Sequence, residues 1–452
     1  MVVRTAELKK LEGIASNSGN QMVLLYGTIF CGGRSLVRQF VRDKECFFTS
    51  MLDASENEQK RKLFSDVMRY FNLDSAPSDY ADAFSKIKGK NGRIVVAIDD
   101  FQNSLKQGLA FLDALKKAKK EGKFGSEVII VLILNDLSHI RKDPEGFLPD
   151  KEGCIDERIL LSDVSFLDIV RAFPGYSVKD TVETYGILGG NHDLIDKWSK
   201  KRSVKENVIA TMLTSQGILF DSANQLLSAE LRELSVYQTL LLSMARGNEK
   251  LNDLYKDTGY SRAKIIVYLK NLESFDIVEK VVSFDTGGWN NAKKGIYRIK
   301  NPFIHFYFKF LYPNLSQLEN MTAESFFNTY IEPELDEYLR WTFIKVCEEY
   351  ISILNMMGKT PVSVEKTGIW LGKKGTIDVI GQDDARNNIV AKTNYDKPEF
   401  PYSDYEKLVD NMSKARITAE AIYLFSATEF DKQLIELSKK DSSIVLVDMK
   451  EL

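Results

Sequence analysis

The chain has 452 residues, of which 44% are hydrophobic and 28% are charged, and its net charge is −3 at pH 7. This composition excludes a disordered chain and supplies enough apolar residues for a large core. The near-neutral balance also excludes a chain-wide basic field that would attract nucleic acid, so any such contact must be local.

The cysteines, the histidines and the N-terminus define the expected compartment. The four cysteines are widely spread without a C-x-x-C motif, and the three histidines show no paired spacing. We therefore expect reduced thiols and no zinc site. The N-terminus lacks the apolar segment of a cleaved signal, and no apolar run approaches 18 residues. These features predict a soluble, cytoplasmic protein with no membrane contact.

After an amphipathic helix over residues 5–14, the sequence MVLLYGTIFCGGRSL has a strand–loop–helix pattern. The pattern is that of a P-loop, G-x-x-x-x-G-K-[ST], whose lysine reaches phosphates and whose hydroxyl binds Mg²⁺. Here the lysine position holds Gly33 and the hydroxyl position holds Arg34, and neither residue can do those tasks. The alternative is an ordinary glycine turn between a strand and a helix. The candidate nucleotide-binding residues are Gly27, Gly32, Gly33, Arg34 and Ser35.

A second apolar run ends in two acids. Residues 93–102 read RIVVAIDDFQ, so that the run leads into Asp99 and Asp100. A buried parallel strand has such a continuous apolar run, and an acid at its carboxyl end is where a P-loop protein holds Mg²⁺. One such acid is a common cap of a strand end. Two such strands in this order favour a P-loop core with Asp99 as the metal ligand.

The remainder of the first domain alternates strands with helices. The predicted elements are strands at 46–51, 127–134 and 158–162, and helices at 56–71, 79–88 and 104–120. This alternation predicts an α/β fold, a P-loop parallel sheet with helices on both faces. We assign residues 1–163 to this core. The short helical patterns that follow predict a helical lid subdomain over residues 164–228.

Residues 229–312 predict a winged helix. Three helical patterns at about 231–246, 249–257 and 262–274 precede two short strands, and Ser261 is suited to cap the third helix. A tract of aromatic residues follows, which is typical of a buried docking helix.

The candidate DNA-binding residues of this module lie on its third helix and in the turn between its strands. Residues 249–300 contain ten Lys/Arg and seven Asp/Glu, a net charge of +3. One interpretation is contact with the phosphates of double-stranded DNA. A winged helix that only packs against protein explains the same pattern. The residues are Arg262, Lys264, Lys270, Lys293 and Lys294.

The last part of the chain predicts a second α/β domain over residues 325–452. Residues 313–316, PNLS, are typical of a linker before it. The predicted elements are helices at 334–354, 404–416 and 429–439, and strands within VSVEKTGIWLG, TIDVIG, NIVAKTNY, AIYLFS and IVLVDM.

These patterns together resemble the archaeal-type ATPase family, a branch of the AAA/STAND P-loop ATPases, fused to a C-terminal domain of restriction-endonuclease-like fold. The resemblance covers almost the whole chain. Its motifs match the family's R-x-x-E-L-x-x-L, loop start, D-E-F-Q, G-G-x-P and E-I-D-V-V at Arg4 to Leu11, Tyr26–Gly27, Asp99–Gln102, Gly189–Gly190 and Ile377–Val379.

Nucleases of that fold use a glutamate on the first helix, an aspartate and an E-x-K motif. The glutamate position holds Ile344 here, the aspartate remains as Asp378, and the E-x-K positions hold Lys392 and Asn394. One carboxylate that faces a lysine cannot hold the metal ion that hydrolysis requires. Asp378, Lys392 and Asn394 are therefore interpreted as a vestigial nuclease site, in which Asp378 serves as a strand-end cap.

Both sites have lost charged groups, whereas the apolar framework keeps the family's pattern. We therefore interpret the chain as a pseudo-enzyme, a scaffold that acts through binding and holds ATP and Mg²⁺ weakly or not at all. Double-stranded DNA is one expected partner, and the sequence does not name a protein partner or an oligomeric state.

Two other interpretations stay open. In the first, the chain is a slow ATPase in which Arg34 and Ser35 replace the lysine and the threonine of the loop. Its further residues would be Asp99 as metal ligand, Asp100 to position water, Asn135 as polar sensor and Arg158 facing phosphate. In the second, residues 249–300 make the chain a DNA-binding or toxin–antitoxin-like regulatory module.

Overall fold

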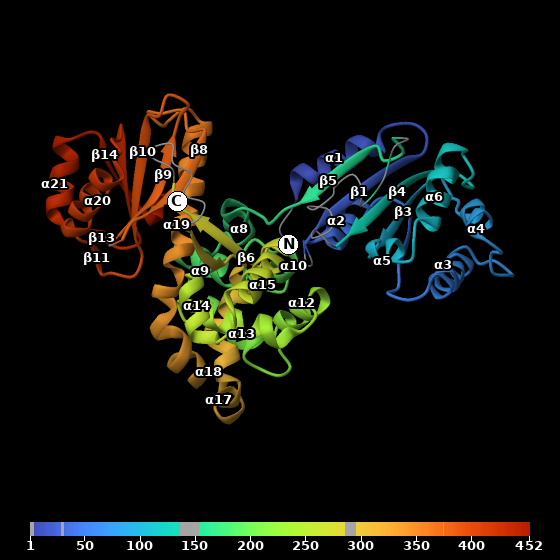
Figure 1. The fold of residues 1–452 in the computed structure, drawn as a ribbon. Coiled ribbons are helices and arrows are strands. Elements are labelled where there is room, and N and C mark those ends of the chain that lie inside the picture. Colours follow the sequence, from blue (N-terminus) through green and yellow to red (C-terminus); the bar gives the residue numbers. More distant parts are fainter. Residues whose placement is uncertain are drawn as a thin grey trace. The chain divides into compact units, whose positions relative to one another are not determined.

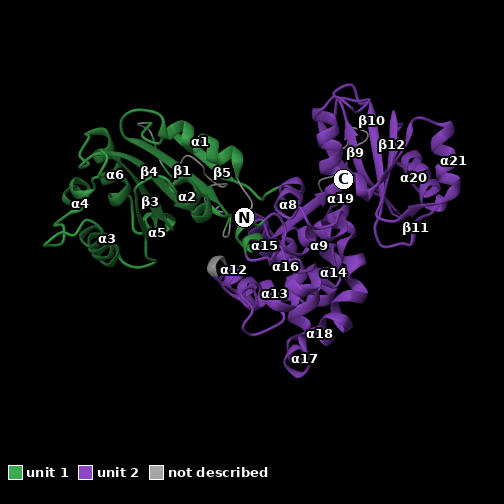
Figure 2. Cartoon of the chain, turned by 180° about the vertical axis from the view of Figure 1, so that it is seen from behind, with its two compact units in different colours: residues 1–164, 191–196 green, residues 165–190, 197–452 purple. Residues whose placement is uncertain are grey.

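A computed structural model describes residues 4–28, 31–135, 148, 150, 153–284, 295–373 and 375–452. The chain forms two compact units, shown in Figure 2. The first contains residues 1–164 and 191–196, and the second contains residues 165–190 and 197–452. The predicted P-loop core falls in the first unit. The residues of the predicted lid, winged helix and C-terminal domain lie in the second unit, apart from Val164 and residues 191–196.

The first unit contains a five-stranded parallel sheet with the strand order β2-β3-β4-β1-β5. The predicted parallel α/β fold is thus confirmed for this unit. After a polar first residue, the central strands β1, β3 and β4 are continuous apolar runs, as is typical of strands that are covered on both faces. The strands are β1 (Gln21–Gly27), β2 (Cys46–Ser50), β3 (Arg93–Asp99), β4 (Glu127–Leu134) and β5 (Glu157–Leu161).

Two cores lie on opposite faces of this sheet. One joins the sheet to α1 (Thr5–Ala15) and α2 (Gly33–Phe40). The other joins it to α3 (Glu56–Tyr70), α4 (Tyr80–Lys86) and α6 (Ala110–Lys120), and Figure 1 shows these helices on the two sides of the sheet.

The prediction of a single helix at 104–120 is wrong. The structure has a short helix α5 (Gln102–Leu105), then Gly108 with φ at +112°, and only then α6. This left-handed backbone suits a glycine and interrupts the helix.

The strand order places the candidate residues of the first unit at one edge. Strand β4 lies between β1 and β3, so the carboxyl ends of all three strands meet. Ligands of open parallel sheets bind in the crevice outside these ends. Gly27, Asp99 and Asn135 each lie at or directly after one of these ends.

The second unit begins with short helices, three of which start at a serine capping box. Ser165, Ser177 and Ser203 each accept a hydrogen bond from the backbone of an acid three residues later, and that acid bonds back. The helices are α8 (Phe166–Ala172), α9 (Val178–Leu188), α11 (Val204–Met212) and α12 (Ser222–Glu230). The helix α10 (His192–Asp196) belongs to the first unit.

Three helices and an antiparallel strand pair follow, in the order that the sequence predicted. Ser261 caps the third helix, as predicted, because its side chain accepts the backbone N–H of Lys264. The elements are α13 (Leu234–Ala245), α14 (Leu251–Thr258), α15 (Arg262–Ser274), β6 (Val278–Val282) and β7 (Gly295–Ile299).

The aromatic tract forms a buried helical segment, as predicted. It comprises α16 (Pro302–Phe306) and a π-helical turn, η1 (Tyr307–Leu311). The linker predicted at 313–316 is wrong, because the chain continues as η2 (Tyr312–Asn314) and α17 (Leu315–Asn320). The Asn314 side chain donates to the carbonyl of Phe310 at 2.9 Å and keeps the segment helical.

The long helix α19 (Glu332–Met356) follows α18 (Ala323–Phe326) and η3 (Phe327–Ile331) and leads into the C-terminal sheet (Figure 1). It packs closely on α9, where the Tyr338 hydroxyl donates to the Gly186 carbonyl at 2.8 Å. A β-carbon on Gly186 would lie 2.1 Å from Leu339 Cδ2, so glycine permits this approach.

The C-terminal sheet is mixed and separate from the first, with the order β14-β12-β10-β9-β8. Strands β8 to β10 are antiparallel, and β10, β12 and β14 are parallel. The helix predicted at 429–439 begins later, because Glu429–Phe430 form the short strand β13 against β11 (Glu399–Phe400). The other elements are β8 (Lys366–Leu371), β9 (Thr376–Gln382), β10 (Asn388–Asn394), α20 (Tyr402–Ala415), β12 (Ala421–Ser426), α21 (Lys432–Lys440), β14 (Ile444–Asp448) and η4 (Met449–Glu451).

Within the described ranges, none of the helices is long and apolar enough to span a bilayer.

Candidate functional site

The glycine loop joins β1 to α2 and is closely packed. Gly32 precedes α2 with φ at +85°, a conformation that favours glycine. A β-carbon on Gly27 would lie 2.8 Å from Cys31 Sγ, and one on Gly33 would lie 2.7 Å from Ile133 Cγ2. The Cys31 side chain and the sheet therefore already fill the space around these glycines. Burial raises the pKa of the Cys31 thiol to about 12.

Arg4 connects this loop to the end of β5 through hydrogen bonds. Its buried guanidinium donates to the carbonyl oxygen of Cys31 at 2.8 Å and to that of Ser162 at 2.6 Å. It also bonds Glu7 at 3.0 Å. The opening R-x-x-E-L motif thus has a structural role, because it positions the loop.

Arg34 contacts the two acids at the end of β3, Asp99 and Asp100. Its Nε donates to Asp99 Oδ2, and its Nη2 donates to Asp100 Oδ2 at 3.0 Å. Asp99 is completely buried, whereas the Arg34 side chain is 51% exposed. Burial, followed by the charge of Asp100, raises the pKa of Asp99, and Arg34 opposes this. Burial alone would lower the pKa of Arg34, but the two carboxylates raise it. Arg34 is therefore a fixed cation at the acid pair.

Asn135 completes this cluster from the end of β4. Its Nδ2 donates to Asp100 Oδ1 at 3.1 Å and lies 3.4 Å from Asp99 Oδ1. Gln102 accepts the backbone N–H of Asn135 at 3.2 Å and thereby holds that residue in place. Asp100 has φ at +49°, a left-handed conformation that aspartate adopts more readily than most residues.

The helix α10 meets the start of α2 in the same unit. Ser35 Oγ donates to Asp193 Oδ1 at 3.4 Å. The His192 ring is so close to Gly32 that a β-carbon there would lie 2.6 Å from its Cγ. Asp193 is thus a carboxylate at the N-terminal turn of α2, where the helix dipole favours an anion. The sequence analysis missed it, because nothing in the local pattern pairs residues 158 positions apart.

Arg158, the predicted phosphate-facing residue, does not join this cluster. It pairs in register with Leu24, three positions before the end of β1, and its guanidinium donates to the Leu148 carbonyl at 3.3 Å. Among the described residues, no hydrogen bond connects it to the glycine loop.

The cations of the predicted winged helix lie on the exposed side of α15. Arg262 stacks over the Tyr255 ring at 4.1 Å, and Lys264 lies 4.5 Å from the centroid of the Tyr260 ring. Lys270 is also exposed. The predicted wing residues Lys293 and Lys294 lie outside the described residues.

The residues after β6 contact the C-terminal sheet. The backbone N–H of Phe284 donates to the Ile369 carbonyl at 2.7 Å, and Leu371 N donates to Ser283 Oγ at 3.0 Å. Strand β8 is an edge strand of its sheet, so this segment covers part of an edge that would otherwise be open.

In the C-terminal sheet, Asp378 is buried on β9 and accepts four hydrogen bonds. One oxygen accepts from Lys392 Nζ and from Thr376 Oγ1, both at 2.8 Å. The other accepts from the backbone N–H and the hydroxyl of Thr393 at 3.1 Å and 3.0 Å. Both oxygens of the Asp378 carboxylate are thus occupied by hydrogen bonds from other residues of the chain.

The other positions of the predicted nuclease motif do not add ligands. Ile344 is half-buried on α19. Asn394 bonds instead to Ser426 and Thr428, at 3.2 Å and 3.1 Å, and so joins the ends of β10 and β12. Across the described part of the chain, no group of three or more His, Cys, Asp or Glu is arranged to hold a metal ion.

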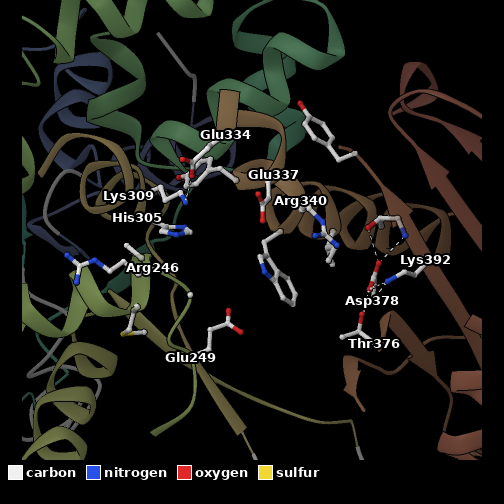
Figure 3. Close-up of a pocket in the computed structure, with 18 residues that line it drawn as sticks. Arg246, Glu249, His305, Lys309, Glu334, Glu337, Arg340, Thr376, Asp378 and Lys392 are labelled. Atoms are coloured by element: carbon white, nitrogen blue, oxygen red, sulfur yellow. Dashed lines mark hydrogen bonds and ion pairs between the residues drawn. The ribbon is translucent and has the colours of Figure 1, made fainter. Parts of the chain in front are cut away.

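A cavity of about 370 Å³ lies beside the pair formed by Asp378 and Lys392, within the second unit (Figure 3). Its lining comes from the turn between α13 and α14, from the aromatic tract, from α19, and from β9 and β10. This cavity could not be predicted from the sequence, because it depends on how elements that are distant in the chain pack together.

The parallel sheet, the glycine loop after β1 and the acid pair after β3 define the first unit as a P-loop ATPase-like fold. Residues 307–397 match the family DUF234, described as archaea bacterial proteins of unknown function. The predicted fold, a P-loop ATPase-like parallel sheet with a further C-terminal α/β domain, is confirmed.

Similar proteins include an uncharacterized protein of Methanocaldococcus jannaschii, MJECL04, which is 24% identical over 384 residues, 85% of this chain and 84% of that protein. Similar solved structures include a Walker-type ATPase of Pyrococcus abyssi, at 17% identity and a TM-score of 0.46, which covers 68% of this chain and 96% of that one. The ORC2 protein of Aeropyrum pernix, in its ADPNP–ADP complexes, is 14% identical with a TM-score of 0.43. The match covers 71% of this chain and 95% of that one.

Proposed function

We propose that this chain is a pseudo-enzyme, a scaffold of P-loop ATPase-like fold that acts by binding and in which basic side chains replace the metal ions. The observation that carries the proposal is the contact of Arg34 with both Asp99 and Asp100. Mg²⁺ needs carboxylate oxygens at close range. A cation fixed there repels a further unit charge by about 4 kcal/mol at ~4 Å and an effective dielectric constant of ~20, and the repulsion doubles for a divalent ion.

The residues of the glycine loop that would contact the phosphates of ATP do not fit that role either. The lysine that would reach the phosphates is Gly33, and Ile133 occupies the space beside it. The hydroxyl of Ser35 already bonds Asp193, a carboxylate that disfavours a second anion nearby. The slow-ATPase alternative requires both Arg34 and Ser35 to leave these partners, so we expect negligible hydrolysis of Mg-ATP. Steady release of phosphate that disappears in Asp99→Asn would contradict this.

The same replacement occurs in the C-terminal sheet, where we expect no metal-dependent nuclease activity. Asp378 has no oxygen left for a metal ion, and Lys392 supplies the positive charge. The measurement is incubation of single- and double-stranded DNA and RNA with the protein, in Mg²⁺ and in Mn²⁺. Intact substrates are the expected result. Cleavage that is lost in Asp378→Ala would overturn this part of the proposal.

A second function, DNA binding, is supported by the cations on the exposed side of α15. Because only a few phosphate contacts are available, we expect weak binding of duplex DNA with little sequence preference. Each neutralised phosphate contributes about −0.9 to the log–log salt slope, so the slope should be roughly −2 to −4. Titration of labelled duplex over a salt series measures it. The double variant Arg262→Ala with Lys264→Ala should make the slope shallower. Lys439→Ala, on α21, serves as the control and should leave the slope unchanged.

If no duplex binds at low salt, or if the double variant behaves like the unchanged protein, α15 is a surface for protein contact. The contact of Ser283 and Phe284 with β8 favours such a role for the neighbouring segment.

A further inference from the structure

The cavity in the second unit has the size of a small-ligand site. Its volume of about 370 Å³ lies within the ~300–1,000 Å³ typical of such sites. All of its lining residues belong to one compact unit. A ligand that binds here without a metal ion rests on the proposed function in one respect, namely that Lys392 has replaced the metal ion.

One side of the cavity presents basic groups. Lys392 has three ammonium protons and uses two of them, on Asp378 at 2.8 Å and on Thr376 at 3.3 Å. Arg340 pairs through Nε with Asp396 at 3.5 Å and is half-exposed. Within the described ranges, no hydrogen bond uses the terminal nitrogens of Arg340. These two side chains can therefore still donate to an anionic group.

An aromatic surface lies in the same cavity. Trp341 lines it, and the guanidinium of Arg298 covers one face of the indole ring at 3.3 Å from the centroid. Arg298 itself does not line the cavity. Burial lowers the pKa of Arg298 to about 10, so the residue stays charged at neutral pH. The guanidinium thus holds the ring from one face, and the part of Trp341 that lines the cavity offers an aromatic surface to a flat ligand.

The other part of the lining holds the carboxylates Glu249, Glu334 and Glu337 together with Arg246 and Lys309, and Lys309 pairs with Glu334. Figure 3 shows Glu249 and Glu337 well away from Lys392 and Asp378. Burial raises the pKa of Glu249 above its usual value, although the charge of Arg298, 3.6 Å away, opposes the rise. Carboxylates only accept hydrogen bonds when ionised, so this side suits a ligand that donates.

We propose that this cavity binds a nucleotide without a metal ion. The phosphate contacts Lys392 and Arg340, the base stacks on Trp341, and an amino group of the base donates to Glu337 or Glu249. Such a ligand has an anionic end, a flat ring and a donor end, and it matches the three parts of the lining. The nucleotide can be free or can be the phosphorylated end of a strand, because both offer the same groups.

The test is calorimetric titration of the full chain with nucleoside 5′-monophosphates and with the corresponding nucleosides, in EDTA. We expect saturable binding of a monophosphate that EDTA does not change, and weaker binding of its nucleoside. Arg340→Gln should weaken monophosphate binding by about tenfold, the loss of one hydrogen bond to a charged group, and should leave nucleoside binding unchanged. Trp341→Leu should weaken both. Arg232→Gln, an exposed arginine outside the cavity, is the matched control.

The outcomes separate this inference from the proposed function. Absence of binding at millimolar concentration, or binding that survives both Arg340→Gln and Trp341→Leu, overturns the inference. If Trp341→Leu does not fold, the selective effect of Arg340→Gln on monophosphates decides. Binding that requires Mg²⁺ and is lost in Asp99→Asn would instead place the nucleotide in the glycine loop and contradict the proposed function. A 5′-phosphorylated trinucleotide that competes with the monophosphate supports recognition of a strand end, and one that does not supports the free nucleotide.

Discussion

Replacing Arg34 with alanine is expected to lower the free energy of unfolding of the first unit by about 3 kcal/mol at pH 7. The change leaves Asp99 buried without its cation, and removing one partner of a buried ion pair costs ~3–5 kcal/mol. The lower end applies because half of the Arg34 side chain is exposed to solvent, which screens the pair. Urea denaturation followed by circular dichroism gives the difference.

The loss in free energy of unfolding caused by Arg34→Ala should grow as the pH rises. Burial and the charge of Asp100 raise the pKa of Asp99, and Arg34 opposes them, so the pKa rises further in Arg34→Ala. A carboxyl whose pKa is raised in the folded state contributes stability below its unfolded pKa, ~3.9, and loses it as the pH rises through the folded pKa. The variant should therefore approach the unchanged protein near pH 4 and fall behind it toward pH 7.

Mg²⁺ provides a second measurement on the same variant. Without Arg34, the acid pair becomes accessible to the ion, and a ligand that binds only the folded state stabilises it. We expect millimolar Mg²⁺ to raise the urea midpoint of Arg34→Ala and not that of the unchanged protein. The control is Arg34→Ala with Asp99→Asn, which should be less destabilised and insensitive to Mg²⁺. An Arg34→Ala variant that is as stable as the unchanged protein at pH 7 would show that the contact is incidental.

Replacing Lys392 with methionine is expected to lower the free energy of unfolding of the second unit by about 3 kcal/mol. Asp378 is 4% exposed and would keep only its bonds from Thr376 and Thr393. Adding Asp378→Asn should recover most of the loss, because the double variant buries no unpaired charge. Lys432→Met, at an exposed position of α21, controls for the loss of a lysine.

The measurement is again urea denaturation, with the two single variants and the double variant forming a cycle. Additive effects of Lys392→Met and Asp378→Asn would mean that the two side chains do not depend on each other. Lys392 would then not serve as the replacement for a metal ion.

The sheet of the first unit was predictable because its central strands are buried on both faces. Strands β1, β3 and β4 are continuous apolar runs, and helices at this spacing force parallel connections. Element boundaries depend on finer causes. Gly108 divides a helix that the periodicity alone predicts as continuous, and a side-chain hydrogen bond of Asn314 keeps helical a segment whose proline and serine are typical of a linker.

The residues of the candidate sites also fall into those that the sequence predicts and those that it does not. Asp99, Asp100 and Asn135 could be predicted together, since each follows a strand of one parallel sheet. The partner of Arg34 could not, because a long side chain reaches several places from the start of a helix. Asp193 and Trp341 were missed for a related reason. Their roles arise from contacts between segments that are far apart in the chain.

Whether the glycine loop accepts a nucleotide with Mg²⁺ decides between a pseudo-enzyme and an ATPase. Calorimetric titration of the purified full chain with ATP, with and without Mg²⁺, tests this directly, and Asp99→Asn provides the matched variant. We predict no heat that depends on Mg²⁺ and no difference between the unchanged protein and Asp99→Asn, because Arg34 already neutralises the acids. Saturable binding of ATP that requires Mg²⁺ and is lost in Asp99→Asn would contradict the account.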